Sequence, residues 1–239
     1  MILGFLASFL ASIAFFFLGY SFQRIRLWRT LYSLRRLWAP FLKLNQALIV
    51  LSTRPGPHTR STPRVSLNEM KAFVRISDTL NLFKTKAIPI DSQVRLDNIV
   101  GHDIVVLGGP LANNVSAEIW QRISERIPFA LDLNKQSIRI SQREYIAVEG
   151  TDGRLKKDYG LIVRQPHPFD EERNMFLCIG CHGYATLGTV RFLTDRHLSG
   201  ELLKAIDDAV SFAALVEFEL QENALSSAKV IECYILARA

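Results

Sequence analysis

Apolar positions run almost without interruption through the first 22 residues, and none of these residues is charged. Six Lys and Arg side chains then follow within residues 23–43. A helix of this length spans about 33 Å at 1.5 Å per residue, which is enough to cross a hydrocarbon layer of roughly 30 Å. We therefore expect residues 1–22 to form a transmembrane helix.

The position of the basic residues sets the expected orientation of this helix. Positive side chains prefer the cytoplasmic side of a membrane span, so the amino terminus is expected outside and residues 23–239 in the cytoplasm. A cleaved signal peptide fits less well, because its charges precede the apolar core and that core is shorter. The sequence thus predicts a single-pass membrane protein with a cytoplasmic carboxyl-terminal domain.

An apolar stripe at helical spacing runs through residues 23–44. Its members recur at steps of four and three residues: Leu27, Leu31, Leu34, Trp38 and Phe41. This spacing predicts a basic amphipathic helix next to the membrane. Two alternatives stay open at this point. The helix either oligomerises or lies in the membrane interface, or it packs on its own domain.

Residues 45–239 alternate short apolar runs with helical patterns, and we expect one domain. Ser66 with Glu69 three residues later forms a capping box that predicts the start of a helix. Further helices are predicted over residues 116–127, 187–193 and 202–209. Strands are predicted over residues 47–51, 103–107, 137–140, 145–148, 159–164, 175–179, 212–220 and 230–236. Strand, glycine turn and helix in this order indicate an α/β fold, namely a Rossmann-like mixed or mostly parallel sheet with flanking helices.

Charge is distributed unevenly along the chain. The whole chain has 29 Lys and Arg against 23 Asp and Glu, a net charge of +6. Nine of the basic residues precede Glu69, the first acidic residue, so the chain after residue 68 carries more acidic than basic side chains. A basic excess confined to a membrane-flanking segment favours anionic lipid over nucleic acid. We therefore expect the membrane as a partner and no nucleic acid.

The motif Cys178-Ile179-Gly180-Cys181-His182 has the spacing of covalent haem attachment. Haem is attached in this way outside the cytoplasm, and Cys178 lies in an apolar run typical of a buried strand. A structural zinc site needs four ligands, and the sequence has no second Cys/His pair at suitable spacing. We expect reduced thiols, with neither a cofactor nor a metal.

Two glycine turns that follow predicted strands are candidate ligand-binding loops. Glycine lets the backbone approach a ligand closely, and amides at the start of the next helix suit phosphate or another anion. The first turn and the Asn side chains after it comprise Gly108, Gly109, Pro110, Asn113 and Asn114. The second turn and its neighbours comprise Gly180, His182, Gly183 and Thr186.

Two further groups of polar residues lie near predicted strands. The first group comprises Asp158, Tyr159, Arg164 and His167. The second follows the strand at residues 47–51 and comprises Arg54, His58 and Arg60. The planar fork of arginine suits phosphate. If the strands are parallel neighbours, all these loops should meet in one crevice at the carboxyl ends of the strands.

Three of these motifs together resemble a poorly characterised bacterial family of Rossmann-like domains. They are Gly-Gly-Pro-x-x-Asn at 108–113, Asp-Tyr-Gly-x-Ile-x-Arg at 158–164, and Gly-x-His-Gly-x-x-Thr at 180–186. The resemblance covers roughly residues 103–193 and implies the fold and the clustering of the loops. The chain departs from the family pattern at Ala185, where glycine is usual, and at His167, where Asn is commoner.

The expected function is the sensing of a nucleotide or phosphorylated metabolite by a membrane-anchored cytoplasmic domain that acts as a signalling effector. This architecture is similar to that of nucleotide-sensing effectors of bacterial antiviral signalling, and a homo-oligomer would suit it. The alternative is a tethered enzyme that cleaves an N-glycosidic bond of a nucleotide or NAD. Its candidate catalytic residues are Glu118, Cys181 and His182.

Overall fold

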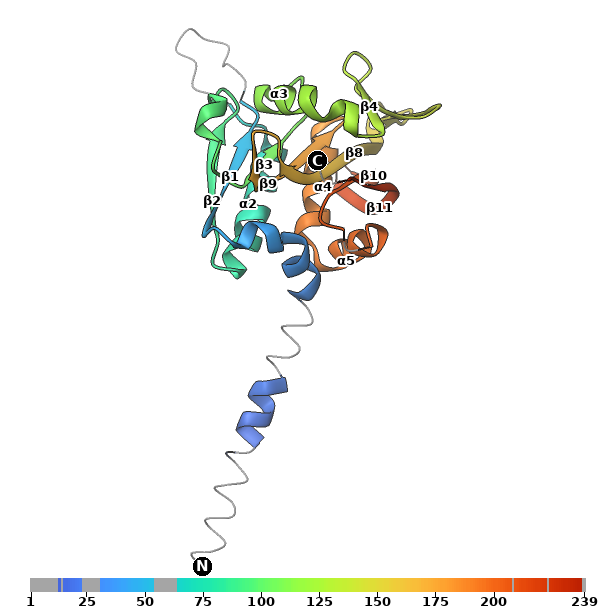
Figure 1. The fold of residues 1–239 in the computed structure, drawn as a ribbon. Coiled ribbons are helices and arrows are strands. Elements are labelled where there is room, and N and C mark those ends of the chain that lie inside the picture. The colour runs from blue at the N-terminus through green and yellow to red at the C-terminus, as the bar shows by residue number, and fades with distance from the viewer. Residues whose placement is uncertain are drawn as a thin grey trace, which may run out of the picture.

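Four neighbouring parallel strands form one half of the central sheet, in the order β9, β3, β1 and β2. Their bounds are β1 (Gln46–Leu51), β2 (Lys86–Asp91), β3 (Ile104–Leu107) and β9 (Asp170–Gly180). The computed structural model in Figure 1 describes residues 13, 15–22, 31–53, 64–207, 209–222 and 224–237. Strands β1 and β3 consist almost wholly of apolar residues because both faces of these strands are covered.

Antiparallel strands form the other half of the sheet. Strand β8 (Leu155–His167) pairs with β9, β10 (Phe212–Gln221) pairs with β8, and β11 (Ala224–Ile235) pairs with β10. The short strand β7 (Val148–Glu149) also pairs with β8. The result is a mixed eight-stranded sheet, which confirms the predicted α/β class and selects the mixed arrangement.

Helices cover one face of the sheet. They are α2 (Leu67–Leu82), α4 (Gly183–Thr194) and α5 (Arg196–Ala205). Their buried side chains share a core with Ile49 and Leu51 of β1. Gly188 of α4 lies so close to the Phe218 ring that a Cβ at this position would overlap the ring. Glycine thus lets α4 sit directly on the sheet.

The opposite face is covered by α3 and a small antiparallel meander. The bounds are α3 (Asn114–Ile123), β4 (Phe129–Asp132), β5 (Ser137–Ile140) and β6 (Arg143–Ile146). Leu48 and Val50 of β1 point into this second core, because neighbouring residues of a strand face opposite sides. In Figure 1, α3 and β4 lie at the top of the view and α5 at the bottom.

The segment before β1 packs into the first core. Residues 31–38 are helical and continue into the 3-10 helix η1 (Ala39–Leu42). Trp38 is fully buried, its Nε1 donates to the Leu193 carbonyl at 2.6 Å, and Phe41 stacks on Phe176. These contacts match the alternative in which the apolar stripe packs on its own domain. Its buried members are therefore not available for a coiled coil.

A second helical stretch covers residues 15–22, and its large apolar side chains are exposed, with Phe15 at 74%. The predicted span of residues 1–22 falls largely outside the described residues. Within the described part of the chain, no helix combines the length and the apolar character that a membrane crossing needs. The transmembrane helix thus stays a prediction.

Two strands were absent from the sequence-based expectation. Strand β2 contains Pro89 and lies at an edge of the sheet, where a missing backbone N–H is tolerated. Strand β4 has only four residues and pairs with β5 alone. The helix boundaries also shift, because α4 already begins at Gly183 and α5 runs over Arg196–Ala205. Two short 3-10 helices, η2 (Leu96–Asn98) and η3 (Ser124–Arg126), complete the fold.

Candidate functional site

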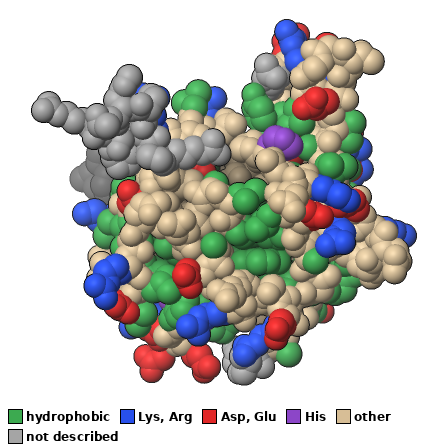
Figure 2. Space-filling view, turned by 90° about the horizontal axis from the view of Figure 1, so that it is seen from above, with side chains coloured by type: hydrophobic (Ala, Val, Ile, Leu, Met, Phe, Trp, Pro, Cys, Tyr) green, Lys and Arg blue, Asp and Glu red, His purple; other side chains and the backbone are tan. Residues whose placement is uncertain are grey.

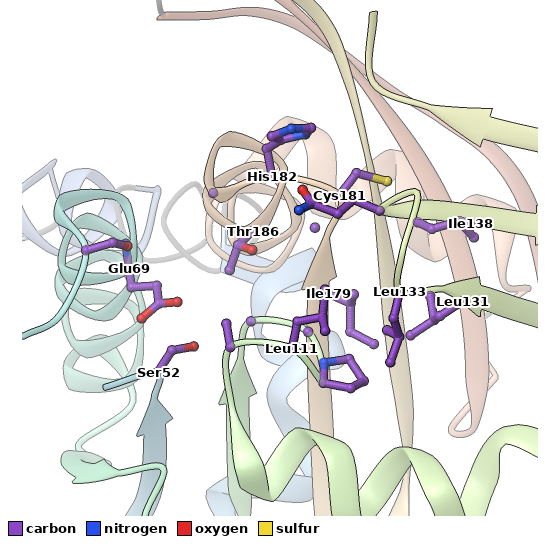
Figure 3. A pocket seen from close by; sticks show the side chains of 18 of the residues that line it. Ser52, Glu69, Leu111, Leu131, Leu133, Ile138, Ile179, Cys181, His182 and Thr186 are labelled. Carbon is purple, nitrogen blue, oxygen red and sulfur yellow. The ribbon is translucent and has the colours of Figure 1, made fainter. Parts of the chain in front are cut away.

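The chain changes direction within the sheet between β1 and β3. From β1 it passes through α2 to β2 on one side, whereas the chain after β3 adds β9 on the other side. Helices α2 and α3 consequently lie on opposite faces. Open α/β sheets bind ligands at the carboxyl ends of the strands that flank such a point. A cavity of about 620 Å³ lies at this place (Figure 3).

Five segments from different elements line the cavity. They are residue 52 after β1, residues 64–69 at the start of α2, residues 108–112 after β3, residues 131–138 of the β4–β5 hairpin, and residues 179–186 between β9 and α4. Ser52 and Glu69 lie on one side in Figure 3, and Leu131 and Ile138 lie on the opposite side. The first turn of α4 lies between these two sides. We call the side with Ser52 and Glu69 the polar end. The opposite side combines the apolar Leu131, Leu133 and Ile138 with the polar Asp132, Gln136 and Ser137 of the same hairpin.

Gly108 forms the floor of the polar end. Its φ of +92° lies in the left-handed region that favours glycine. A Cβ at this position would overlap Ser52 Oγ and would lie 3.2 Å from Glu69 Oε1. Both oxygens therefore face the same point above the Gly108 backbone. Glu69 is only 7% exposed, although it belongs to the first turn of a helix.

Helix α2 brings Glu69 to this position. The Glu69 amide donates to Ser66 Oγ at 3.2 Å, which confirms the helix start predicted from the capping box. A carboxylate in the first helical turn is favoured by the helix dipole. Figure 3 shows its carboxyl group pointing toward Ser52. The same residue thus starts the helix and supplies an acidic group to the cavity.

The glycine turn after β9 forms the middle of the cavity. A Cβ on Gly180 would overlap the His182 carbonyl and the Thr186 amide, so only glycine allows α4 to begin this close to β9. His182 is the N-cap residue of α4, and within the described residues its side chain makes no capping hydrogen bond. The first turn of α4 therefore faces the cavity through Gly183 and Thr186.

Asp158 lies under this turn and is fully buried. Its Oδ2 accepts from the Ala185 amide at 2.9 Å, and its Oδ1 accepts from the Tyr159 amide at 2.9 Å. The same Oδ1 lies 3.6 Å from His182 Nδ1. This hydrogen-bonding partner raises the pKa of His182 above its usual value. The buried carboxylate therefore favours the protonated form of His182 at the rim of the cavity.

Cys181 lies in the cavity wall but lacks the properties of a nucleophile. Burial, together with the nearby Asp158 charge, raises the pKa of its thiol to about 12. Its Sγ contacts the Tyr145 carbonyl at 3.9 Å, and in Figure 3 it points away from the His182 ring. Neutral thiols are poor nucleophiles, so Cys181 and His182 do not form a catalytic pair in this arrangement. Cys178 is buried in β9, as predicted, which leaves the haem motif without an accessible first cysteine.

The structure brings eight of the residues singled out in the sequence to the cavity. They are Gly108, Gly109, Pro110, Gly180, Cys181, His182, Gly183 and Thr186. Both glycine turns therefore meet at one crevice, because β3 and β9 are parallel neighbours with aligned carboxyl ends.

Four other candidates do not line the cavity. Asn113 is buried, caps α3 through the Ser116 amide and donates to the Leu107 carbonyl. Tyr159 donates to Glu217 at 2.9 Å. Asn114 and Glu118 line a separate hollow beside α3. The structure thus places Glu118 away from the carboxyl group and the glycines that meet at the switch point.

Arg164 and His167 are not brought to this edge of the sheet. Strand β8 runs antiparallel to β9, so Gly160 pairs with Gly180 at the cavity end while residues further along β8 approach the opposite end. Arg164 donates there to the backbone carbonyls of Leu37, Ala209 and Val210. Burial lowers the pKa of His167 to about 4. The expectation that these two residues share the crevice is therefore corrected. The remaining candidates, Arg54, His58 and Arg60, lie outside the described residues.

Several lining residues were missed by the sequence analysis. The polar ones include Ser52, Arg64, Ser137 and Glu69, and the apolar ones include Leu111, Leu131, Leu133 and Ile138. Ser52 follows a predicted strand directly, so its position was a usable signal. The sequence analysis did single out Glu69, but only as part of the capping box that predicts the start of a helix. The hairpin residues gave no local signal, because their contribution depends on how the meander folds over β8.

Comparison with known proteins adds no family to these observations. No protein-family model matches the chain, and no curated protein matches its sequence significantly. What the chain shows is a mixed α/β sheet, partly parallel, with flanking helices and a cavity at its switch point.

Proposed function

We propose that the chain is a membrane-anchored sensor whose cavity binds a nucleotide or a similar phosphorylated metabolite. The observation that carries the proposal is the 620 Å³ cavity at the switch point, with Ser52 and Glu69 at one end and Leu131 and Ile138 at the other. Ligand pockets of this size combine apolar walls with a few placed polar groups. A nucleotide is divided in a comparable way into an aromatic base, whose faces pack on apolar side chains and whose edge is polar, and a polar sugar and phosphate.

The first turn of α4 is the site that suits the phosphate. Backbone amides at a helix start and the helix dipole favour an anion. The Ala185 amide donates to Asp158 and the Thr186 amide to the His182 carbonyl, so a phosphate would bind the Gly183 and Tyr184 amides at the outer edge of this turn. The partly exposed His182 and Arg64 add basic groups along the lining. Seen from above the domain, apolar and uncharged atoms fill much of the surface centre, and charged side chains lie mainly toward the rim (Figure 2).

Membrane attachment completes the proposal. The described apolar residues 15–22 are helical and exposed. Six basic side chains follow them within residues 24–43 of the sequence. Burying such side chains in lipid is favourable, whereas exposing them to water is not. The segment before β1 enters at the amino end of that strand, and the cavity lies at its carboxyl end. The binding site is thus on the side of the sheet away from the segment that leads to the anchor.

Ligand binding is tested on the full chain in detergent micelles, by melting it with a panel of nucleotides and sugar phosphates. At least one nucleotide should raise the melting temperature. Gly109→Val should remove the shift, because a Cβ at Gly109 already lies 3.2 Å from Ile179 Cγ2 and the larger side chain fills the cavity floor. Gly200→Val is the matched control, since a Cβ at Gly200 meets open space. A complete panel without any shift would contradict the proposal.

The anchor is tested separately, by alkaline extraction of membranes that contain the full chain. We expect the chain to stay in the membrane pellet. Ile13→Lys should move part of it to the soluble fraction, because a charge near the middle of a span costs about 3 kcal/mol. Phe22→Lys is the control, since a lysine near the end of a span reaches the headgroups. Full extraction of the unaltered chain would contradict the anchor.

A further inference from the structure

Ser52 and Glu69 place two oxygens side by side at the polar end of the cavity. Ser52 follows β1, Glu69 lies in the first turn of α2, and Gly108 follows β3, so three elements converge here. A Cβ on Gly108 would overlap Ser52 Oγ and lie 3.2 Å from Glu69 Oε1. The pair exists because position 108 has no side chain. This arrangement plays no part in holding a phosphate, which a carboxylate repels.

Both oxygens act as acceptors toward a ligand. The only hydroxyl proton of Ser52 is donated to the Leu107 carbonyl at 3.1 Å, so Oγ has only lone pairs left to offer. An ionised carboxylate also accepts hydrogen bonds and donates none. A ligand group that fits this end must therefore present two donors close together.

We propose that Ser52 and Glu69 bind the two vicinal hydroxyl groups of a ribose ring. This inference rests on the proposed function, since it names the part of the nucleotide that the polar end recognises. A ribose 2′,3′-diol supplies two donors on adjacent carbon atoms, which matches two adjacent acceptors. Hydrogen bonds from hydroxyl groups to a carboxylate are short and strong.

The other walls of the cavity agree with this orientation. A ribose carries its base, its diol and its phosphate on three different sides. The cavity correspondingly has a hairpin side, where Leu131 and Ile138 lie with polar neighbours such as Gln136, an acceptor side with Ser52 and Glu69, and the first turn of α4 between them. The base then lies on the hairpin side and the phosphate at α4. The site would favour ribonucleotides over nucleotides without hydroxyl groups.

The test measures dissociation constants of the full chain in detergent micelles for the best-binding ribonucleotide and for its 2′-deoxy, 3′-deoxy and 2′,3′-dideoxy forms. The unaltered chain should bind the dideoxy form about 10- to 100-fold more weakly. Glu69→Gln keeps the shape of the side chain but replaces an acceptor with a donor. It should therefore weaken binding of the ribonucleotide by a similar factor. In that variant, removing the two hydroxyl groups from the ligand should reduce its affinity little further. Such non-additivity between the substitution and the ligand change is expected when the side chain contacts the hydroxyl groups directly.

Glu201→Gln is the matched control, because it makes the same substitution in a carboxylate of α5 that lies outside the cavity lining and pairs with His197. It should keep the full preference for the ribonucleotide. Ser52→Ala provides a second variant with the same expected loss of preference, should Glu69→Gln fold poorly. Melting curves without ligand confirm that each variant is folded.

Two results would overturn the inference while leaving the proposed function intact. One is equal affinity of the unaltered chain for the ribonucleotide and its dideoxy form. The other is an undiminished ribonucleotide preference in both Glu69→Gln and Ser52→Ala. A requirement for guanine that depends on Glu69 and ignores the hydroxyl groups would show that the acceptors bind the base, which also overturns it. Absence of binding by any nucleotide overturns both proposals.

Discussion

The Asp158 carboxylate and the His182 imidazole lie 3.6 Å apart at the first turn of α4, one fully buried and the other at the cavity rim. Asp158 also accepts the amides of Tyr159 and Ala185, so it is held in place from two sides. The pair therefore connects β8 with the start of α4. The hydrogen bond to Asp158 is the main cause that raises the pKa of His182. Protonation of His182 should therefore strengthen this pair.

Stability should fall when His182 loses its proton. The pKa of His182 is higher in the folded chain than its reference value of about 6.5, so the stabilisation is fully present below that pH and is lost as pH rises through the folded-state pKa. The measurement is the free energy of unfolding by urea between about pH 6 and pH 9. His182→Gln should flatten the decline. An equally steep decline in that variant would contradict the assignment.

Gly108→Ala should destabilise the fold more than Gly101→Ala. Both glycines have positive φ, so alanine is strained at either position, at a cost of about 1 kcal/mol or more. Only at Gly108 does the added Cβ also overlap Ser52 Oγ, whereas at Gly101 it meets open space. Overpacking adds about 1 to 3 kcal/mol. Urea unfolding of both variants gives the comparison, and equal losses would show that the close contact costs nothing.

Arg164→Lys should lower stability without changing ligand affinity. The guanidinium donates to three backbone carbonyls that a lysine ammonium cannot reach in the same planar geometry. Loss of such buried hydrogen bonds costs about 2 to 5 kcal/mol. Arg164 lies at the end of the sheet away from the cavity, so the nucleotide dissociation constant should stay within about twofold. Arg95→Lys is the control, since Arg95 is exposed and bonds only to Asp97 among the described contacts. A loss of affinity at unchanged stability would restore Arg164 as a ligand-binding residue.

Alkylation of Cys181 should be slow. At about pH 8 a thiol with a pKa near 12 is almost wholly protonated, and iodoacetamide reacts with the thiolate. The native chain should react at least a hundredfold more slowly than the urea-unfolded chain, because burial also raises the pKa of Cys178 and Cys233. Mass spectrometry of the labelled peptides identifies each site. Rapid labelling of Cys181 would indicate an activated thiol and favour the enzyme alternative.

Local sequence patterns predicted the half of the sheet that forms the cavity. The runs that became β1, β3 and β9 are apolar, end at Ser52, Gly108 and Gly180, and lead into helices or loops. Such strands are buried on both faces, so their pattern is strong. β2 was missed because its exposed residues and Pro89 weaken that pattern at the edge of the sheet.

Local sequence patterns could not predict the direction in which β8 runs relative to β9. Arg164 follows Asp158 in one apolar strand, and nothing within that strand says which of its ends meets the carboxyl end of β9. Only the pairing of Gly160 with Gly180 decides this, and it depends on segments distant in the sequence. Glu69 was missed for another reason. Its place in a capping box explained a carboxylate at that position, so a second role left no trace in the pattern.

Helix α4 contacts both the proposed binding cavity and the segment that precedes β1. Its first turn lines the cavity through Thr186, and the Leu193 carbonyl in its last turn accepts the Trp38 indole. Its twelve residues span about 18 Å as one continuous helix. A single helix, α4, thus connects the binding site with the segment that leads out of the domain, and it contacts that segment at Trp38. If a bound ligand tilted α4 at Thr186, the Leu193 carbonyl would carry that displacement to Trp38 without an intervening loop.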